Sequence, residues 1–210
     1  MEGVYINLLS REDRRKNFEI HVKSNAFFSN ITRMPGIKSQ DGSVGCGLSH
    51  IQALQLYQNT EHPYVAIMED DFTILDKYEL SNFINAFEKI KDLDEWKVIV
   101  LTPRGVTIPN TNNMTEAGFK RIHENQTTTG YVIKKDMIPI LIENIKEAIH
   151  LQLLGGDKNI CSIDQYWKRL QENYPFYYYS GIFAGQLPGW SDIEGREVNY
   201  NDRFLKQQFY

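Results

Sequence analysis

The chain has 210 residues, 41% of them hydrophobic and 24% charged, which is the composition of a soluble globular protein with a substantial core. Its formal net charge of −4 argues against a general nucleic-acid binder, because such proteins carry a strongly basic face. No stretch approaches the ~20 consecutive apolar residues that cross a bilayer, so we expect no transmembrane segment.

The hydrophobic pattern of the first half predicts short strands that alternate with helices. The expected elements are a strand over 4–9, a helix over 11–24, a strand over 26–33, a loop over 34–45, a helix over 47–57 and a strand over 64–68. Ser10 directly precedes the first helix and is its expected N-cap.

The second half continues this alternation. The expected elements are a helix over 80–90, a strand over 97–101, a polar loop over 103–124, a strand over 127–133, a helix over 135–150, a short helix over 162–170 and a strand over 176–179. Because such alternation builds βαβ units, we predict an α/β fold with helices flanking a mostly parallel central sheet. No repeat or linker divides the chain, so we expect a single domain over residues 1–210.

Three consecutive acids, Glu69, Asp70 and Asp71, follow the strand over 64–68. The unbroken apolar run is typical of a strand buried on both faces, and ligands of open α/β sheets bind beyond the carboxyl ends of such strands. Three carboxylates there would repel one another unless a cation lay among them, and Mn²⁺ or Mg²⁺ prefers carboxylate oxygens. We therefore predict a metal site at Glu69 and Asp71, which strand alternation places on one side, with Asp70 facing away. A charged turn is the alternative.

Polar residues beside other predicted elements add further candidates. Asn7 and Arg11 follow the first strand, where an arginine fork suits nucleotide phosphates and a solvated helix face is the alternative. Ser49 and His50 belong to the segment Gly45-Cys46-Gly47-Leu48-Ser49-His50, whose glycines would open a helix and let an anion approach its N-terminus. A hydrogen-bonded structural role for His50 is the more frequent one.

Two acids in the last quarter of the chain have a functional and an ordinary interpretation. Asp164 lies in the first turn of the predicted short helix, where it would take a proton from an attacking hydroxyl or simply complement the helix dipole. Asp192 follows a Gly-rich segment, which suits a contact to phosphate or a simple cap.

The cysteines indicate the redox compartment. Cys46 and Cys161 are too few for a disulfide framework, and neither belongs to a Cys-x-x-Cys pair, so structural zinc is not expected. We expect reduced thiols in a cytoplasmic protein, free or peripheral to a membrane, and a single bridge is the alternative.

Several of these segments, in their order and spacing over about residues 4–194, resemble glycosyltransferase family 25, which includes bacterial lipooligosaccharide and collagen galactosyltransferases. The segments that carry the likeness are Ile6-Asn7-Leu8, Arg11-Glu12-Asp13-Arg14-Arg15, Gly45 to His50, Met68-Glu69-Asp70-Asp71, Thr129 to Ile133, Ser162-Ile163-Asp164 and Ser191-Asp192-Ile193. Two positions depart from the family pattern: Ser43-Val44 replaces a usual acid, and Thr129-Gly130 stands where alanine is more common.

The resemblance implies a GT-A-like fold and an inverting transfer of a sugar, galactose above all, from a UDP-sugar to a hydroxyl of a glycan or glycoprotein. It implies Mn²⁺ or Mg²⁺ at Asp71 with Glu69, and Asp164 as the base. The donor-binding positions that it implies are Asn7, Arg11, Ser49, His50, Glu69, Asp70 and Asp192. The loop over 103–124 is then expected to close over the donor and exclude water.

Two alternatives to this function stay open at the level of sequence. A metal-dependent nucleotidyl or phosphoryl transferase would also place acids after a buried strand. An inactive glycosyltransferase-like domain would bind glycans or partners without catalysis, although such a domain has no need for Glu69, Asp71, Asp164 and Asp192 together.

Overall fold

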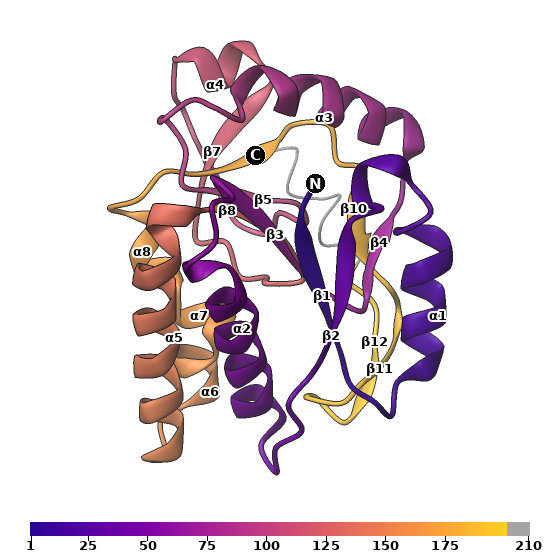
Figure 1. Cartoon of the computed structure of the whole chain (residues 1–210). Coiled ribbons are helices and arrows are strands. Elements are labelled where there is room, and N and C mark those ends of the chain that lie inside the picture. Colours follow the sequence, from indigo (N-terminus) through magenta and orange to yellow (C-terminus); the bar gives the residue numbers. More distant parts are fainter. Residues whose placement is uncertain (201–210) are drawn as a thin grey trace.

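A computed structural model describes residues 1–200 and centres on one eight-stranded sheet (Figure 1). Its strands are β1 (Gly3–Asn7), β2 (Ile31–Pro35), β3 (Tyr64–Glu69), β5 (Val98–Val100), β6 (Val106–Ile108), β7 (Phe119–His123), β8 (Gly130–Lys134) and β9 (Phe176–Tyr179). Their order across the sheet is β2-β1-β3-β8-β5-β9-β7-β6. Only β7 and β8 run against the other six of these strands, so the sheet is mostly parallel in direction.

Helices and short strands complete the described part of the chain. The helices are α1 (Glu12–His21), α2 (Gly42–Gln58), α3 (Lys77–Ile90), α4 (Asn113–Glu116), α5 (Ile138–Leu153), α6 (Lys158–Cys161), α7 (Ile163–Tyr166) and α8 (Lys168–Gln171), with 3-10 turns at Ala26–Phe28 and Lys135–Met137. β4 (Phe72–Ile74) pairs with β10 (Ala184–Gln186), and β11 (Gly189–Ser191) pairs with β12 (Arg196–Val198) as a hairpin. None of the helices within residues 1–200 combines the length and apolar character that spanning a bilayer requires.

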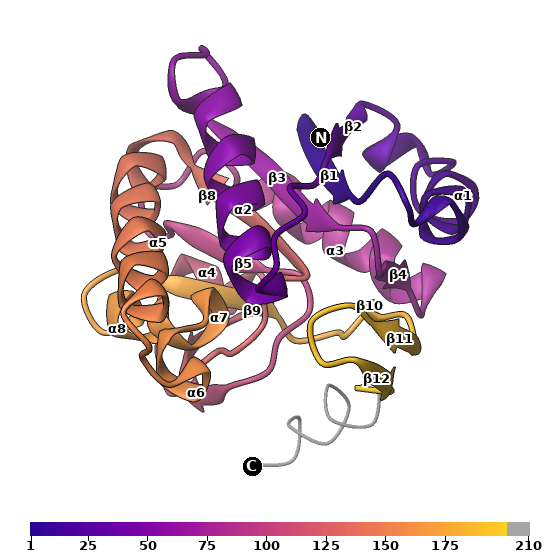
Figure 2. The ribbon, with the colours of Figure 1, turned by 90° about the horizontal axis from the view of Figure 1, so that it is seen from below.

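The central sheet is buried on both faces, as the apolar run of β3 illustrates. Val65 and Ile67 pack in the cluster that contains α2 and α5, whereas Ala66 and Met68 pack in the cluster that contains α1 and α3. Alternate residues of a strand point to opposite faces, so a continuous apolar sequence is what a sheet covered by helices on both sides requires. Figures 1 and 2 show α2 and α5 side by side on one face of the sheet.

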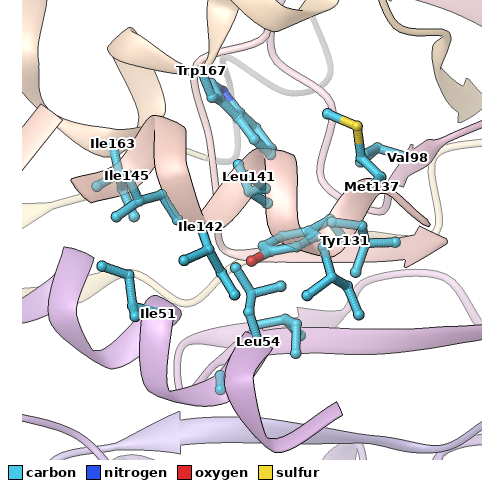
Figure 3. Close-up of a cluster of buried hydrophobic side chains, with 14 of the residues drawn as sticks. Ile51, Leu54, Val98, Tyr131, Met137, Leu141, Ile142, Ile145, Ile163 and Trp167 are labelled. Atoms are coloured by element: carbon cyan, nitrogen blue, oxygen red, sulfur yellow. The ribbon is translucent and has the colours of Figure 1, made fainter. Parts of the chain in front are cut away.

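The core between α2, α5 and the sheet contains the largest side chains of this half. Figure 3 shows Ile51 and Leu54 of α2 facing Ile142 of α5, with Tyr131 of β8 beside them. Trp167 packs edge-to-face on Tyr131, with their ring centroids 5.6 Å apart. The polar groups of both rings are satisfied, because Trp167 Nε1 donates to Asn125 O and the Tyr131 hydroxyl meets His50.

This architecture confirms the predicted α/β fold with a mostly parallel central sheet flanked by helices. Several local expectations are wrong. Residues 103–124 are not a long loop, because β6, α4 and β7 lie within them and the two strands pair at the edge of the sheet next to β9. Phe119 and Ile122 are the apolar residues of β7, and because they lie three positions apart they do not show the alternation that indicates a strand. The expectation that a long loop over 103–124 closes over the donor is therefore wrong.

Two helix starts also differ from expectation. Arg11, not Ser10, is the N-cap residue of α1, and its side chain makes no capping bond. α2 begins at Gly42, where Asp41 accepts a bond from Ser43 N, so Gly45 and Gly47 lie inside the helix. A Cβ at Gly45 would lie 2.6 Å from Ile37 O, and one at Gly47 would lie 3.0 Å from Ile149 and Ile163. These glycines allow close packing; they do not open the helix to an anion.

Candidate active site

Asn7 and the acids after β3 meet at one edge of the sheet, because β1 and β3 are parallel neighbours whose carboxyl ends coincide. Asn7 Nδ2 donates to Asp70 Oδ2 over 2.7 Å, and Asn7 Oδ1 accepts from Arg33 Nε over 2.8 Å. Asn7 is 1% exposed. Asn7 therefore lies at the sheet edge where it was expected, and it contributes to the site by orienting Asp70.

Asp70 and Asp71 both contact the same atom of Arg14, a residue of α1. Arg14 Nη1 lies 3.1 Å from Asp70 Oδ1 and 3.1 Å from Asp71 Oδ2. The expectation that Asp70 faces away from Asp71 is therefore wrong. The physical reason is that β3 ends at Glu69, so Asp70 and Asp71 lie in a turn where strand alternation no longer applies.

Asp71 is the most perturbed carboxylate of this turn. It is 4% exposed, and burial, followed by the nearby charge of Glu69, raises its pKa to about 7. Asp71 Oδ2 also accepts from Gln186 Nε2 over 2.9 Å, whereas Oδ1 has no hydrogen-bond partner among the described residues. Burial likewise raises the pKa of Asp70. The turn thus holds more negative charge than Arg14 alone neutralises.

Glu69 contacts α2 and the segment before β8, and it lines one cavity together with Asp70 and Asp71. Its Oε1 accepts from Thr128 Oγ1 over 2.9 Å and lies 3.4 Å from His50 Nε2. Burial opposes ionisation, but His50, Thr128 and Arg14 outweigh it and hold the pKa of Glu69 below its usual value. His50 itself is fully buried, and its Nδ1 lies 3.1 Å from the Tyr131 hydroxyl. Glu69 is therefore an ionised carboxylate held in a fixed orientation.

Two cavities adjoin at Glu69. The first, called here the acid cavity, has a volume of about 290 Å³ and is lined by Arg14, His50, Asp70, Asp71 and others. The second, called the Asp164 cavity, has about 470 Å³, and Asp164 is part of its wall. Residues on the walls of both are Cys46, Glu69, Gln186, Ser191 and Ile193. The arrangement offers two ligand spaces with Glu69 between them.

Asp164 lines the second cavity together with two other acids, Glu69 and Glu194. It lies in α7 and is half-buried, and burial, followed by the charge of Glu69, raises its pKa to about 6. A carboxylate with a pKa just below neutrality is ionised at pH 7 and remains basic enough to accept a proton. The structure brings Asp164 and Glu69 to one cavity although 95 positions separate them in sequence.

The β11–β12 hairpin forms a wall of both cavities, and two arginines of the α1 region hold it. Arg14 Nη2 donates to Trp190 O over 2.7 Å, and Arg11 Nη1 donates to the same oxygen over 3.2 Å. Arg11 Nη1 also lies 2.7 Å from Asp192 Oδ2. Arg11 and Asp192, predicted as separate donor contacts, are thus joined in an ion pair at the turn between β11 and β12. Figure 2 shows this hairpin next to β10.

Ser49 has a role within the fold. Its hydroxyl donates to Gly45 O over 2.7 Å and accepts from Ile37 N over 2.8 Å, and its residue is 2% exposed. Ile37 and its neighbours line the acid cavity. Ser49 therefore fixes the wall of the predicted donor site from behind.

The residues present are compatible with a hard divalent cation at the acidic turn. Carboxylate oxygens are its preferred ligands, and Asp71 Oδ1 is a buried oxygen without a partner among residues 1–200. A cation would also offset the charge repulsion that raises the pKa of Asp71. Asp71 and the neighbouring Glu69 are the groups that would hold it.

Sequence reasoning missed Arg14 as the central cation of the site, together with Thr128 and Gln186. The position of Arg14 could have been inferred from the sequence, because Arg14 lies four residues before Phe18, which is buried against the sheet. Residues four apart share a helix face, so Arg14 had to point toward the carboxyl ends of β1 and β3. Thr128 and Gln186 carried no comparable signal.

Comparisons with known proteins give a family and a shared fold. Residues 38–155, more than half of the chain, match the family described as Glycosyltransferase family 25 (LPS biosynthesis protein). No curated protein matches the chain. Among solved structures, a glycosyltransferase involved in the glycosylation of the major capsid of PBCV-1 has a TM-score of 0.51 at 8% identity, with 99% of this chain and 98% of that chain covered. At such identity the likeness concerns the fold alone.

Two further solved structures are more distant. Mannose-1-phosphate geranyltransferase from Thermus thermophilus has a TM-score of 0.44 at 11% identity; 86% of this chain is covered, and the chain spans only 59% of that protein. UDP-glucose pyrophosphorylase complexed with UDP-glucose has a TM-score of 0.48 at 13% identity, with 98% of this chain and 79% of that chain covered.

Proposed function

The chain belongs to glycosyltransferase family 25, and we propose that it transfers a sugar, galactose from UDP-galactose first among candidates, to a hydroxyl of a glycan or glycoprotein with inversion at the anomeric carbon. Glycosyl transfer needs two substrates side by side. The two cavities that share Glu69 supply such spaces, and this single observation carries the proposal.

The acid cavity is assigned to the donor. Its walls contain the carboxylates of Asp70 and Asp71 and the guanidinium of Arg14. Asn7 orients Asp70, and Ser49 fixes the Ile37 segment of the wall. Glu69, at the junction of the two spaces, would accept a hydrogen bond from a donor sugar hydroxyl, because an ionised carboxylate is an acceptor. The Thr128 hydroxyl keeps this carboxylate in place.

The Asp164 cavity is assigned to the acceptor. Asp164 would take the proton of the acceptor hydroxyl as that hydroxyl attacks the anomeric carbon from the face opposite the leaving diphosphate. Its raised pKa suits this task, since a stronger acid would be a poor base. The β11–β12 hairpin borders both spaces and would exclude water that otherwise hydrolyses the donor.

Asp71 and Glu69 would hold Mn²⁺ or Mg²⁺, and such a cation supplies positive charge against the charge that grows on the leaving diphosphate. Arg14 contributes fixed positive charge to the same turn through its contacts with Asp70 and Asp71. We also propose a cytoplasmic location, since both cysteines are free and the cytoplasm is reducing.

The proposal is tested by incubating the purified chain with a panel of nucleotide sugars and glycan acceptors, with and without Mn²⁺. The expected products are a nucleoside diphosphate and a glycosylated acceptor with inverted anomeric configuration, read by mass spectrometry and NMR. Release of pyrophosphate instead would indicate a nucleotidyl transferase. Binding of donor without turnover would indicate an inactive domain.

Variants connect this assay to the geometry. Glu69→Gln is expected to reduce transfer strongly, because the amide keeps the shape of the carboxylate but removes its charge. Glu88→Gln, an exposed residue of α3 paired with Lys91, is the matched control and should leave transfer unchanged. Equal activity of the two variants would contradict the assignment of Glu69.

A further inference from the structure

A thiol, an imidazole and a carboxylate converge where the two cavities meet. Sγ of Cys46, a ring nitrogen of His50 and a carboxylate oxygen of Glu69 all lie within 4.8 Å of one another. Cys46 and His50 are four residues apart on α2 and therefore share a helix face, while Glu69 ends β3. The three groups thus come from two rigid elements.

His50 is oriented as a ligand would be. The ring is fully buried and lies nearly parallel to Tyr131, at an interplanar angle of 16°. Nδ1 lies 3.1 Å from the Tyr131 hydroxyl, so one ring nitrogen is fixed by the core. Nε2 points to the cluster, 3.4 Å from Glu69 Oε1, and has no hydrogen-bond partner of proper geometry among residues 1–200.

This pattern is typical of a metal-binding histidine, whose second nitrogen is usually held by a neighbouring polar group. Glu69 is held in the same way, because Thr128 Oγ1 donates to its Oε1 over 2.9 Å. A buried imidazole nitrogen facing a carboxylate oxygen without a good hydrogen bond is costly, and a cation between the two would satisfy both.

We propose that Cys46, His50 and Glu69 form a binding site for a borderline-soft divalent metal such as Zn²⁺ or Co²⁺, which differs from the all-oxygen site at Asp71 although Glu69 belongs to both. One sulfur, one nitrogen and one oxygen ligand favour these ions over Mn²⁺ and Mg²⁺. The fourth position is open, since Cys46 and Glu69 line both cavities. Three protein ligands with one open position are typical of reactive or exchangeable zinc sites.

Binding at this site releases a proton. Burial raises the pKa of the Cys46 thiol well above its usual value, so the free protein carries the protonated form. As the sulfur–metal bond forms, the S–H bond breaks and the proton passes to solvent; no electrons are transferred.

Occupancy would also affect the proposed reaction. The metal would engage Glu69, which lies between the donor and acceptor spaces, so Zn²⁺ should inhibit a transferase supported by Mn²⁺. This consequence rests on the proposed function, whereas metal binding itself does not.

The test uses the full chain, freed of metal by dialysis against a chelator and titrated with Co²⁺ under reducing conditions. We expect one equivalent to bind with a near-ultraviolet thiolate-to-cobalt charge-transfer band and the visible bands of four-coordinate cobalt, both abolished by excess Zn²⁺. Cys46→Ser should lose the charge-transfer band. Cys161→Ser, which removes the other free thiol, at α6, is the matched control and should keep it.

Tyr131→Phe tests the orienting hydroxyl and should weaken Co²⁺ binding by about 10- to 100-fold while the band remains. X-ray absorption at the zinc edge of the wild-type protein gives a readout that depends on no variant: one sulfur with nitrogen or oxygen neighbours is expected. A wild-type protein without a thiolate band, a band that persists in Cys46→Ser, or a spectrum with no sulfur neighbour would overturn the proposal.

Inhibition is measured separately, as the ratio of transfer rates with and without Zn²⁺ at fixed Mn²⁺. The ratio should fall for the wild type and for Cys161→Ser and stay unchanged for Cys46→Ser. A cobalt spectrum as expected, combined with no transfer to any acceptor, would uphold the site and reject the proposed function. Normal transfer without a thiolate band would uphold the proposed function and reject the metal site.

Discussion

Arg14 Nη1 lies 3.1 Å from Asp71 Oδ2 and so ties helix α1 to the acidic turn after β3. The side chains of Arg14 and Asp71 are 15% and 6% exposed, so this ion pair is largely shielded from water. The same guanidinium reaches Asp70 and the hairpin oxygen of Trp190. One arginine thus pairs with both acids, offsets part of their charge and holds the segment that borders both cavities.

Asp71→Asn should make the metal-free protein more stable at alkaline pH. Because burial, followed by the charge of Glu69, raises the pKa of Asp71 to about 7 from 3.8, the folded protein retains a proton that the unfolded chain has lost between these values. The stability of the wild type therefore falls as pH rises from about 4 to 7, and the asparagine variant escapes this loss. The difference, about 4 kcal/mol for a pKa raised from 3.8 to about 7, should be smallest near pH 4 and largest above pH 7.

Thermal melts across this pH range measure the effect, with and without Mn²⁺. At pH 8, Mn²⁺ should raise the melting temperature of the wild type and leave Asp71→Asn unchanged, because a ligand that binds the folded state alone stabilises it. A variant that is less stable than the wild type at every pH would contradict the shift assigned to Asp71.

Asp164 should govern the acidic limb of the rate profile. Burial, followed by the charge of Glu69, raises its pKa to about 6, so below this pH the carboxyl is protonated and loses its ability to act as a base. We expect kcat/KM to fall about tenfold per pH unit below pH 6. Asp164→Asn should lower transfer by about 100- to 10,000-fold and remove this limb.

The control for Asp164 is Asp136→Asn. Asp136 is an exposed acid that follows β8 and pairs with Lys97, which precedes β5. This variant should leave both rate and profile unchanged. An Asp164→Asn variant that keeps the acidic limb would assign that limb to another group.

Arg14→Gln should loosen the hairpin and destabilise the fold. The substitution leaves Asp70 and Asp71 buried without their cation, which costs about 3 kcal/mol. Urea unfolding measures this loss, and hydrogen exchange should show faster exchange over residues 189–198, since Trp190 O loses one of its two arginine donors.

Arg15→Gln is the matched control for Arg14. Arg15 is adjacent on α1, its side chain is 35% exposed and it lies 3.6 Å from Glu12, so its loss should cost less than about 1 kcal/mol. Equal destabilisation by the two variants would show that α1, rather than the acidic turn, is the sensitive element.

Ser49→Ala should destabilise the protein by about 1–2 kcal/mol, because it removes the acceptor of the Ile37 N–H group in a buried place. Ser81→Ala is a control of the same chemistry. Ser81 also donates to the carbonyl four residues earlier, Lys77 O, but it is exposed and no other segment depends on it. Urea unfolding of both variants compares them, and an effect of equal size would reject the structural role of Ser49.

Part of the site could be predicted from local sequence. The apolar run of β3 followed by Glu69, Asp70 and Asp71 indicated polar groups at the carboxyl edge of a buried strand, and the structure places them there. The orientation of Asp70 was not predictable in this way, because it depends on where β3 ends. That end is set by the pairing of β3 with β1 and β8 and not by the acids themselves.

The fold, like the site, was predictable only where the local sequence pattern is strong. Strongly periodic elements such as α3 and β3 were recognised, since burial of one helix face or of both strand faces leaves a clear pattern. β6 and β7 were missed, because an edge strand buries few side chains and its sequence remains polar. The single domain expected over residues 1–210 is described by the structure only up to residue 200.

The sequence by itself determined the alternation of strands and helices, the acidic end of β3 and the family of the chain, since each depends on residues close together or in a fixed order. Only the tertiary structure decided that Arg14 is the counter-ion of the acids, that Asp164 and Glu69 share a cavity, and that Cys46 and His50 face Glu69. These relationships join segments far apart in the chain. Their geometry is set by how helices pack on a twisted sheet, which no local pattern specifies.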